Sequence, residues 1–437
     1  MKKLMTSLSI LAGVTTLTAC SGDKSDEVSN STEIVTKIEN PVKIEFWHAM
    51  SGANQEAVDK LVEQFNSTIG AEKGITVEAL YQGSYTDLKT KTTAALKSGT
   101  VPALAQAYPD YVAEYLESGA VVELDPYIFN EEVGISDFED IIKSYRDENS
   151  QYSGGKFYSL PFNKSTEVLY YNKKFFEENN LAVPTTWEEV EEVSAKIYEL
   201  TGKPAFGFDS APNYFITMVQ QFGGQYTNSQ GELLFAEDGA KAAIAALELL
   251  QRNTDAGYWR LPGEDIYLSG PFLAENLFMY IGSSAGYSNI ASAEFEIGVA
   301  PIPQISEETG AVIQQGTNVV VFNKNKSSEE IYAAYEFAKY LSSAEANLEF
   351  TKMTSYLPVR ESVLNSEAYQ TYAAELEDQT KVVAPQQASK YFYDAAFYTD
   401  TYSSYNVRSA ISQAVESVVY AGVSPEAAIE EALNSLK

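Results

Sequence analysis

Few side chains of this sequence could carry out the usual kinds of chemistry. It contains one histidine, His48, and one cysteine, Cys20, so neither a Cys/His zinc site nor an internal disulfide can form. An enzyme built from this chain would depend on carboxylate, Tyr, Lys or Ser side chains. His48 follows an alternating strand pattern, and we interpret it as a structural residue or a residue at the rim of a site. No metal and no cofactor is predicted.

A turn of small residues is a candidate anion site. Residues 282–286, Gly-Ser-Ser-Ala-Gly, follow a strand pattern and precede a predicted helix at Ser288. Free backbone N–H groups at the start of a helix bind anions such as phosphate. The alternative interpretation is an ordinary tight connection between a strand and a helix.

The charge balance excludes some classes of partner. The chain has 437 residues, with 30 Lys and Arg against 61 Asp and Glu, and a formal net charge of −31. Nucleic acids and anionic lipids both bind basic surfaces, so neither is an expected partner. Apolar residues make up 45% of the sequence, which is enough for more than one hydrophobic core.

The N-terminal segment predicts export and a lipid anchor. Two lysines precede an apolar stretch, residues 4–17, that is too short to span a bilayer and is typical of a signal peptide. The sequence around Cys20, Leu-Thr-Ala-Cys-Ser-Gly, resembles the bacterial lipobox, so we predict cleavage of residues 1–19 and acylation of Cys20, for example by palmitate. An ordinary secretory signal is the alternative. Residues 20–40 are polar and are predicted to form a disordered tether.

From residue 41 onward, strand and helix patterns alternate. The start of the folded chain reads βαβαβ, which is typical of an α/β domain with a mostly parallel sheet. Two separate strands are predicted at 158–161 and 167–171, and a capping box at Thr186 begins a helix that ends near Leu200. Further helices are predicted at 237–251, 328–341 and 425–437, and further strands at 277–281, 296–300 and 318–323. Two α/β domains with a cleft between them are therefore expected, with ligands at the carboxyl ends of strands.

Five short motifs resemble those of one transport family. They occur in the order Glu-Phe-Trp-His-Ala-Met (45–50), Tyr-Gln-Gly-Ser-Tyr (81–85), Pro-Phe-Asn-Lys-Ser-Thr (161–166), Val-Leu-Tyr-Tyr-Asn-Lys (168–173) and Tyr-Leu-Pro-Val (356–359). Together they resemble family 1 extracellular solute-binding proteins of bacterial ABC importers, and within that family the glycerol-3-phosphate-binding type. The resemblance implies a two-lobed, type II periplasmic-binding-protein-like α/β fold with hinge closure. We predict a first lobe of residues 41–155 and 292–345, and a second of residues 156–291 and 346–437.

The resemblance also implies a set of ligand-binding residues. Where the family has a Glu after a strand end this chain has Asp110, and where the family has paired Trp residues it has Pro212 and Phe215. Because the protein is so acidic, a phosphate must be held by a local cation, and Arg408, placed ahead of a helix, is that residue. The alternative for Arg408 is an ordinary salt bridge. The predicted ligand-binding residues are Tyr85, Asp110, Ser165, Phe215, Ser283, Gly316, Tyr356 and Arg408.

The expected function is non-enzymatic capture of a small polar solute. The resemblance implies a monomer that is lipid-anchored at the extracellular face of the cytoplasmic membrane and delivers glycerol 3-phosphate or a glycerophosphodiester to permease subunits. A neutral sugar or oligosaccharide is the first alternative. A surface glycan-binding protein, or a glycoside hydrolase using two carboxylates, is the second. The aromatic segment 391–405, with Asp394 and Asp400, also suggests a choline site that includes Tyr393 and Tyr398.

Overall fold

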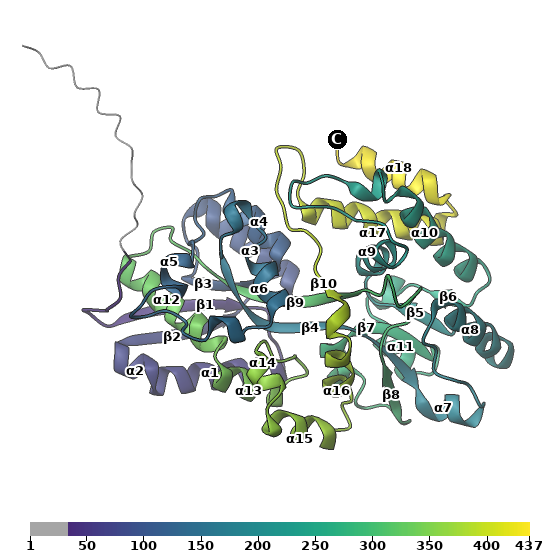
Figure 1. Ribbon diagram of the computed structural model, residues 1–437, viewed down its shortest axis with the longest axis horizontal. Helices are drawn as coiled ribbons and strands as arrows, with labels where there is room; N and C mark the ends of the chain where they lie inside the picture. Colours follow the sequence, from purple (N-terminus) through teal and green to yellow (C-terminus); the bar gives the residue numbers. More distant parts are fainter. Residues whose placement is uncertain (1–33) are drawn as a thin grey trace, which may run out of the picture. The chain divides into compact units, whose positions relative to one another are not determined.

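The computed structural model describes residues 34–437 (Figure 1). The predicted signal peptide and Cys20 lie outside the described residues. Of the predicted tether, residues 34–40 are described and contain no helix or strand. Ile34 and Ile38 in this segment pack against the hydrophobic core that includes strand β1 (Val42–His48), so the last residues of the predicted tether belong to the folded part.

The first part of the sheet has the predicted βαβαβ order. Strand β1 pairs in parallel with β2 (Ile75–Tyr81) on one side and with β3 (Leu104–Ala107) on the other. Helices α1 (Ala53–Ser67) and α3 (Tyr85–Ser98) connect these strands. Parallel pairing brings the carboxyl ends of the three strands to one edge of the sheet, where the loops that follow them can meet a ligand.

Two long strands run from one half of the sheet into the other (Figure 1), and we call them the crossing strands. They are β4 (Ser159–Asn172) and β9 (Val312–Val321), which pair with each other in antiparallel fashion. The prediction of two separate strands at 158–161 and 167–171 was wrong. Residues 162–166 between them are also buried and continue the ladder with β9, with one shift of register after Pro161.

The second half of the sheet is built on β4. Strand β7 (Met279–Ser283) and β8 (Ile297–Ala300) pair with β4 in antiparallel fashion, while β5 (Phe206–Phe208) lies parallel to β7 and β6 (Trp259–Arg260) parallel to β5. The full order is β2-β1-β3-β9-β4-β7-β5-β6, with β10 (Tyr391–Phe392) on β9. The sheet is therefore mixed: it is parallel at its two ends and antiparallel in its middle, where β9 pairs with β3 and β4, and β4 pairs with β7 and β8.

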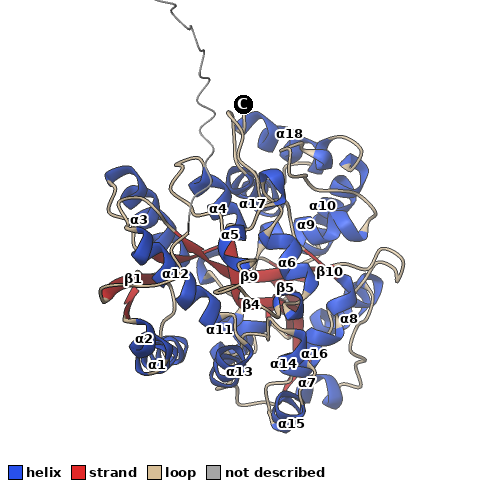
Figure 2. Ribbon diagram, turned by 60° about the vertical axis from the view of Figure 1, so that its left-hand side comes forward, coloured by secondary structure: helices blue, strands red, loops and turns tan. Residues whose placement is uncertain are grey.

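Helices cover both faces of the sheet (Figure 2).

The predicted capping box at Thr186 is confirmed, because its hydroxyl accepts a hydrogen bond from Glu189 N and the Glu189 carboxylate accepts one from Thr186 N. The remaining α-helices are α2 (Ile69–Lys73), α4 (Pro109–Leu116), α5 (Asp125–Ile128), α6 (Lys143–Asn149), α7 (Lys173–Glu178), α8 (Trp187–Thr201), α9 (Ala211–Gln221), α10 (Ala240–Asp255), α11 (Ser269–Leu273), α12 (Ser328–Leu341), α13 (Ala344–Met353), α14 (Glu361–Leu364), α15 (Glu367–Glu375), α16 (Thr380–Gln386), α17 (Ser404–Ala421) and α18 (Pro425–Ser435).

Two large hydrophobic cores lie on either side of the crossing strands. One gathers apolar residues of β1, α1 and α12, together with Phe350 of α13. The other gathers apolar residues of α8, α9, α10 and α17. Both receive side chains from β4 and β9, so the crossing strands connect two separately packed bodies. The lobe boundaries stay a prediction.

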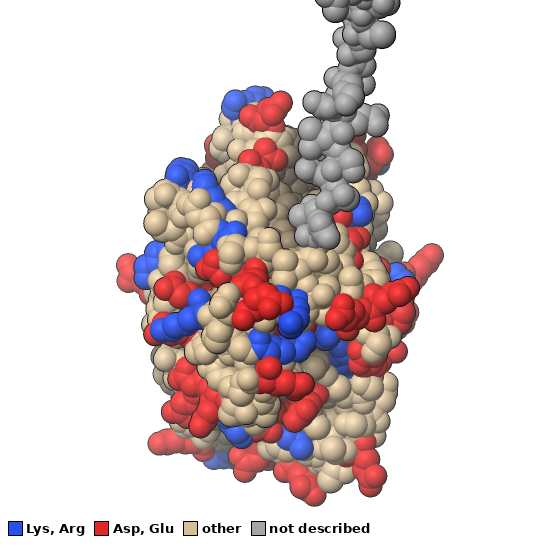
Figure 3. Space-filling model, turned by 90° about the vertical axis from the view of Figure 1, so that its left-hand side faces the viewer, with Lys and Arg blue, Asp and Glu red and all other residues tan. Residues whose placement is uncertain are grey.

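The surface carries many acidic side chains, and the single histidine is buried. Acidic side chains dominate the face drawn in Figure 3, with Lys and Arg interspersed. No helix within residues 34–437 has both the length and the apolar character needed to cross a bilayer. His48 is 1% exposed, its Nδ1 accepts a hydrogen bond from Met50 N at 3.2 Å, and burial lowers its pKa to about 4. It is a neutral residue of the interior.

A buried ion pair lies beside the paired strands β4 and β9. Lys164 of β4 is fully buried, and its Nζ contacts Glu148 Oε2 of α6 at 2.5 Å. From β9, Gln314 Nε2 donates to Glu148 Oε1 at 2.9 Å and Asn318 Nδ2 donates to Glu148 Oε2 at 3.2 Å. Burying two charges costs desolvation energy that is offset only when both are paired and hydrogen-bonded, as they are here.

We predict that Lys164→Met lowers the free energy of unfolding by about 3 to 5 kcal/mol, because it leaves the Glu148 carboxylate buried and unpaired. Denaturant unfolding followed by circular dichroism measures this. The double variant Lys164→Met/Glu148→Gln should recover most of the loss. A single variant as stable as the wild type would show that the pair does not hold the crossing together.

Candidate functional site

A cavity of about 830 Å³ lies beside the crossing strands. Residues of β4 and β9 line it, together with the loops that follow the carboxyl ends of β1, β3 and β7. This is the position at which α/β proteins bind ligands. The structure brings all but one of the predicted ligand-binding residues to this cavity, namely Tyr85, Asp110, Ser165, Ser283, Gly316, Tyr356 and Arg408.

Phe215 does not line the cavity. It lies on α9 one turn beyond Pro212, and its ring is fully buried in the second hydrophobic core. There it makes edge contacts with Tyr226 and Phe235. Pro212 and Asn213, at the start of α9, do line the cavity. Phe215, which we matched to one of the family's paired Trp residues, is therefore a core residue in this fold.

Two tyrosine hydroxyls meet on the side of the first strands. Ser84 caps α3 through a capping box and so fixes Tyr85 at the first helical position. The hydroxyls of Tyr85 and Tyr356 are 3.3 Å apart, and Asn163 Nδ2 donates to Tyr85 at 3.0 Å. Burial raises the pKa of Tyr85 and of Tyr356, so both remain neutral hydroxyl groups that can donate to a ligand.

Two serine hydroxyls meet on the opposite side. Ser283 ends β7, and its Oγ donates to Ser165 Oγ of β4 at 3.2 Å. The backbone N–H of Ala285 donates to Ser283 Oγ at 3.2 Å, and a short 3₁₀ helix (Ser284–Asn289) follows. The predicted anion turn at 282–286 thus has one of its N–H groups already used by the serine cap. The serine hydroxyls themselves remain as polar groups facing the cavity.

Gly316 sits on β9 at a point of very close approach to β4. Its φ is +95°, in the region that favours glycine, and a Cβ atom there would lie 2.1 Å from the Asn163 carbonyl oxygen. Any other residue would separate the two crossing strands beside the cavity. Glycine is required here by packing as well as by backbone conformation.

Arg408 reaches the cavity from inside a helix. It lies in the second turn of α17 and not ahead of the helix as predicted, because Ser403 is the N-cap. Its guanidinium donates to Asp394 Oδ2 at 2.9 Å and to Asn213 Oδ1 at 2.5 Å. Burial disfavours the charged form, but Asp394 and Asp110 outweigh it and raise the pKa of Arg408. The side chain is 23% exposed, so a solute in the cavity can reach it.

Carboxylates outnumber cations in the cavity. Asp110, Glu148, Glu167, Asp209 and Asp394 line it, and Arg408 is the one Lys or Arg among the lining residues. Burial raises the pKa of Asp110 to about 7, of Glu167 to about 7 and of Asp209 to about 6, although Arg408 opposes the shift at Asp110 and Glu167. These groups are therefore partly protonated near neutral pH, and a bound cation or hydroxyl donor would favour their charged form.

Tyrosine rings form a wall in which only Tyr85 was among the predicted ligand-binding residues. The ring centroids of Tyr85 and Tyr108 are 5.0 Å apart, those of Tyr108 and Tyr111 are 5.4 Å apart, and those of Tyr111 and Tyr405 are 5.8 Å apart. All four rings line the cavity. The only sequence signal was their position: Tyr108 and Tyr111 flank Asp110 directly after β3. Two residues of the suggested choline site, Tyr393 and Tyr398, do not line it.

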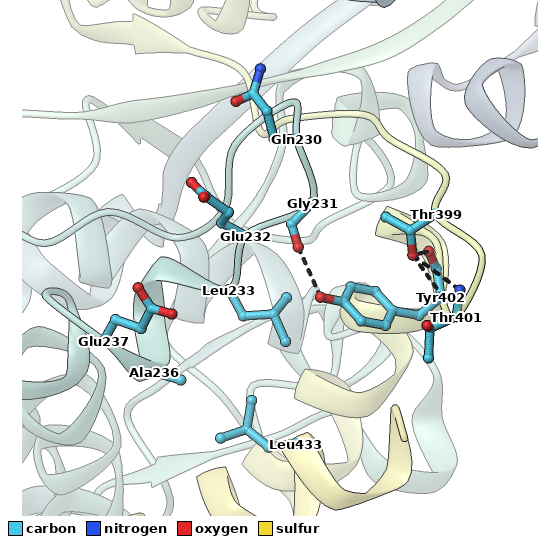
Figure 4. Close-up of a pocket in the computed structure, with 10 residues that line it drawn as sticks. All are labelled: Gln230, Gly231, Glu232, Leu233, Ala236, Glu237, Thr399, Thr401, Tyr402 and Leu433. Carbon is cyan, nitrogen blue, oxygen red and sulfur yellow. Dashed lines mark hydrogen bonds between the residues drawn. The ribbon is translucent and has the colours of Figure 1, made fainter.

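A second hollow, of about 650 Å³, lies apart from these residues (Figure 4). It is formed by the loop at 230–237, by Thr399 to Tyr402 and by Leu433 of α18. The Tyr402 hydroxyl donates to the Gly231 carbonyl across it at 2.9 Å. None of the predicted ligand-binding residues lines this hollow.

We predict that Glu167→Gln stabilises the protein at pH 8 but not at pH 4. The pKa of this glutamate rises from 4.5 to about 7 on folding, so the wild type loses stability as pH rises through that interval. Gln keeps an oxygen for the hydrogen bond from Asn213, at 3.1 Å in the wild type, without the buried charge. Thermal unfolding at several pH values measures the difference.

Glu191 is the matched control for this experiment. It lies outside the cavity, where hydrogen bonds from Arg252 and Asn253 overcome the effect of burial and lower its pKa. Glu191→Gln should therefore destabilise the protein at pH 8. Equal effects of the two variants at pH 8 would contradict the conclusion that the buried charge of Glu167 lowers the free energy of unfolding.

The chain is similar to known transport receptors along most of its length. The family model described as bacterial extracellular solute-binding protein matches residues 60–377. The sn-glycerol-3-phosphate-binding periplasmic protein UgpB of Salmonella typhimurium is 26% identical over 329 residues, which cover 72% of this chain and 74% of that protein. The protein of the same name from Escherichia coli K12 is 26% identical over 332 residues, with the same coverage.

Solved structures share the fold at lower identity. UgpB from Mycobacterium tuberculosis in complex with glycerophosphocholine has a TM-score of 0.78 and 23% identity, covering 91% of this chain and 98% of that one. The GacH receptor of Streptomyces glaucescens, solved unliganded and with acarbose, has a TM-score of 0.76 and 19% identity, with the same coverage. The matched family model, which spans well over half of the sequence, shows that this chain belongs to the bacterial extracellular solute-binding proteins.

Proposed function

We propose that this protein captures a glycerophosphodiester with a cationic head group and delivers it to the permease of an ABC importer. The family supplies the general role of a solute receptor. Arg408 is the observation on which the proposed solute rests, because its guanidinium lies in a cavity that is also lined by many hydroxyl groups. A guanidinium binds a phosphate through two parallel, charge-assisted hydrogen bonds.

The surplus of carboxylates favours a diester over a monoester. A phosphate monoester carries up to two negative charges near neutral pH, and it would face five carboxylates with one guanidinium to hold it. A phosphodiester carries one negative charge. A quaternary ammonium head group would add a positive charge, which the remaining carboxylates and the faces of the tyrosine wall can stabilise.

The relatives support a glycerol phosphate, and one structural neighbour supports the diester. The similar UgpB proteins are named for sn-glycerol 3-phosphate, and the structural neighbour from Mycobacterium tuberculosis holds glycerophosphocholine. Tyr85, Ser165, Ser283 and Tyr356 line the cavity, and we propose that their hydroxyls bind the glycerol unit. We further propose that the two predicted lobes close on the solute by bending at β4 and β9, and that the chain binds without turnover as a monomer.

We also propose that the mature protein is held at the extracellular face of the cytoplasmic membrane by lipid on Cys20. A single acyl chain gives only weak membrane binding, so the lipoprotein form with several chains is required for stable anchoring. We expect Cys20→Ser to move the protein from the membrane fraction to the soluble fraction and to abolish labelling by radioactive palmitate. Retention of the variant in the membrane fraction would contradict this anchor.

The solute is tested by calorimetric titration of residues 22–437 with glycerophosphocholine, sn-glycerol 3-phosphate and maltose. We expect glycerophosphocholine to bind most tightly. Arg408→Gln should weaken that binding by about 2 to 3 kcal/mol, or about 30- to 150-fold, because a charged hydrogen-bond anchor is lost. Arg252→Gln, which breaks an ion pair with Glu191 outside the cavity, is the matched control. Unchanged binding by the Arg408 variant would overturn the proposal.

A neutral oligosaccharide is the second candidate, and the contacts of Arg408 favour it. The guanidinium is already hydrogen-bonded to Asp394 and Asn213. The carboxylates of the cavity can accept hydrogen bonds from sugar hydroxyls, and 830 Å³ is large enough for several sugar units. In that case maltose or a longer saccharide would bind, and Tyr356→Ala would weaken binding more than Arg408→Gln.

A further inference from the structure

The cavity has an aromatic side chain on the side of the second half of the sheet, at a position that the family motifs do not mark. Pro212 and Phe215 offer no aromatic surface there, because one is not aromatic and the other is in the core. Tyr267, on the loop between β6 and α11, does line the cavity. Its side chain is 62% exposed, whereas Tyr108 and Tyr111 of the opposite wall are largely buried.

The loop that carries Tyr267 is firmly held at both ends. Leu261 and Leu268 are buried, and the Leu268 N–H donates to Asp209 Oδ1 at 2.7 Å. At the other end, the Arg260 guanidinium donates to the carbonyl oxygens of Leu261 at 3.1 Å and Pro262 at 3.0 Å. A loop fixed in this way presents its tip in one place. Asp209, the carboxylate that holds it, is itself a cavity residue.

The tip of this loop is strained and exposed. Ile266 has a φ of +64°, which a β-branched residue rarely adopts, and the Tyr267 N–H donates to the Asp265 carbonyl at 2.7 Å in a tight turn. Among the described residues, Ile266 at 70% and Tyr267 at 62% are the most exposed of the large hydrophobic side chains. Strain of this kind persists where the surrounding structure enforces it, and it is concentrated at ligand clamps.

We propose that Tyr267 is a specificity-determining residue that covers the bound solute from the second half of the sheet. The same cavity is lined by the tyrosine row from Tyr85 to Tyr405, so a bound solute can contact Tyr267 as well as these rings. Closure of the cavity buries the ring of Tyr267 against the solute, where it contacts apolar C–H groups or a cationic head group. This inference rests on the proposed function for the role of the cavity but not for the identity of the solute.

Nitration of tyrosine tests the proposal directly. The protein is treated with tetranitromethane, with and without saturating glycerophosphocholine, and each tyrosine is assayed by mass spectrometry. We expect Tyr267 to be nitrated in the free protein and protected several-fold by the ligand. Tyr398, which is 48% exposed and outside the cavity, is the matched control and should react equally in both samples. Equal nitration of Tyr267 with and without a bound ligand would overturn the proposal.

Substitutions separate a binding role from a structural role. Tyr267→Ala should weaken glycerophosphocholine binding about tenfold, while Tyr267→Phe and Tyr398→Ala bind like the wild type. The melting temperatures of the free variants should match that of the wild type, because the side chain is exposed. Normal binding by Tyr267→Ala would contradict the proposal.

The outcome also distinguishes this inference from the proposed function. If the wild type binds maltose in place of glycerophosphocholine, the proposed solute is wrong, and the same assays are run with maltose. Protection of Tyr267 by maltose would then still support its covering role. A wild type that binds neither probe overturns both proposals.

Discussion

Lys164 and Glu148 form an almost fully buried ion pair beside the crossing strands β4 and β9. The pair is tolerated because Gln314 and Asn318 of β9 complete the hydrogen bonding of the carboxylate. The same place carries Gly316, whose missing side chain lets the strands approach. Glu148, Gln314 and Gly316 all line the cavity. The contacts between β4, β9 and α6 thus also form part of the cavity, and a motion that bends these strands must change its shape.

The electrostatics of the cavity follow from this arrangement. Glu148 forms an ion pair with Lys164, and Arg408 forms an ion pair with Asp394. These two cavity residues therefore already have a partner of opposite charge. Asp110, Glu167 and Asp209 remain without a salt bridge among the described residues, and burial raises the pKa of each. A solute that brings hydroxyl or cationic groups would relieve these carboxylates. A solute with only negative charge would not, and this favours a diester with a cationic head group over a monoester.

Much of the site could be predicted from the sequence, because its residues lie in local motifs at strand ends. Tyr85 follows a capping Ser and Ser283 follows a predicted strand, so position in the chain nearly fixes position in the fold. The prediction that Phe215 lines the cavity was wrong, because a motif match does not show which side chains of a helix face the core. Tyr267 was missed because its loop has no motif, and only the packing of Leu261 and Leu268 brings it to the cavity. We predicted two strands in place of β4 because Asn163, Lys164 and Ser165 are polar. In the structure all three are buried and form hydrogen bonds with other side chains.

The most direct measurement is a crystal structure of residues 22–437 grown with glycerophosphocholine. We expect a closed cavity in which the phosphate accepts hydrogen bonds from Arg408, the glycerol hydroxyls contact the tyrosine and serine groups, and the head group lies among the carboxylates. A phosphate bound away from Arg408, or a cavity that stays empty at saturating ligand, would contradict it.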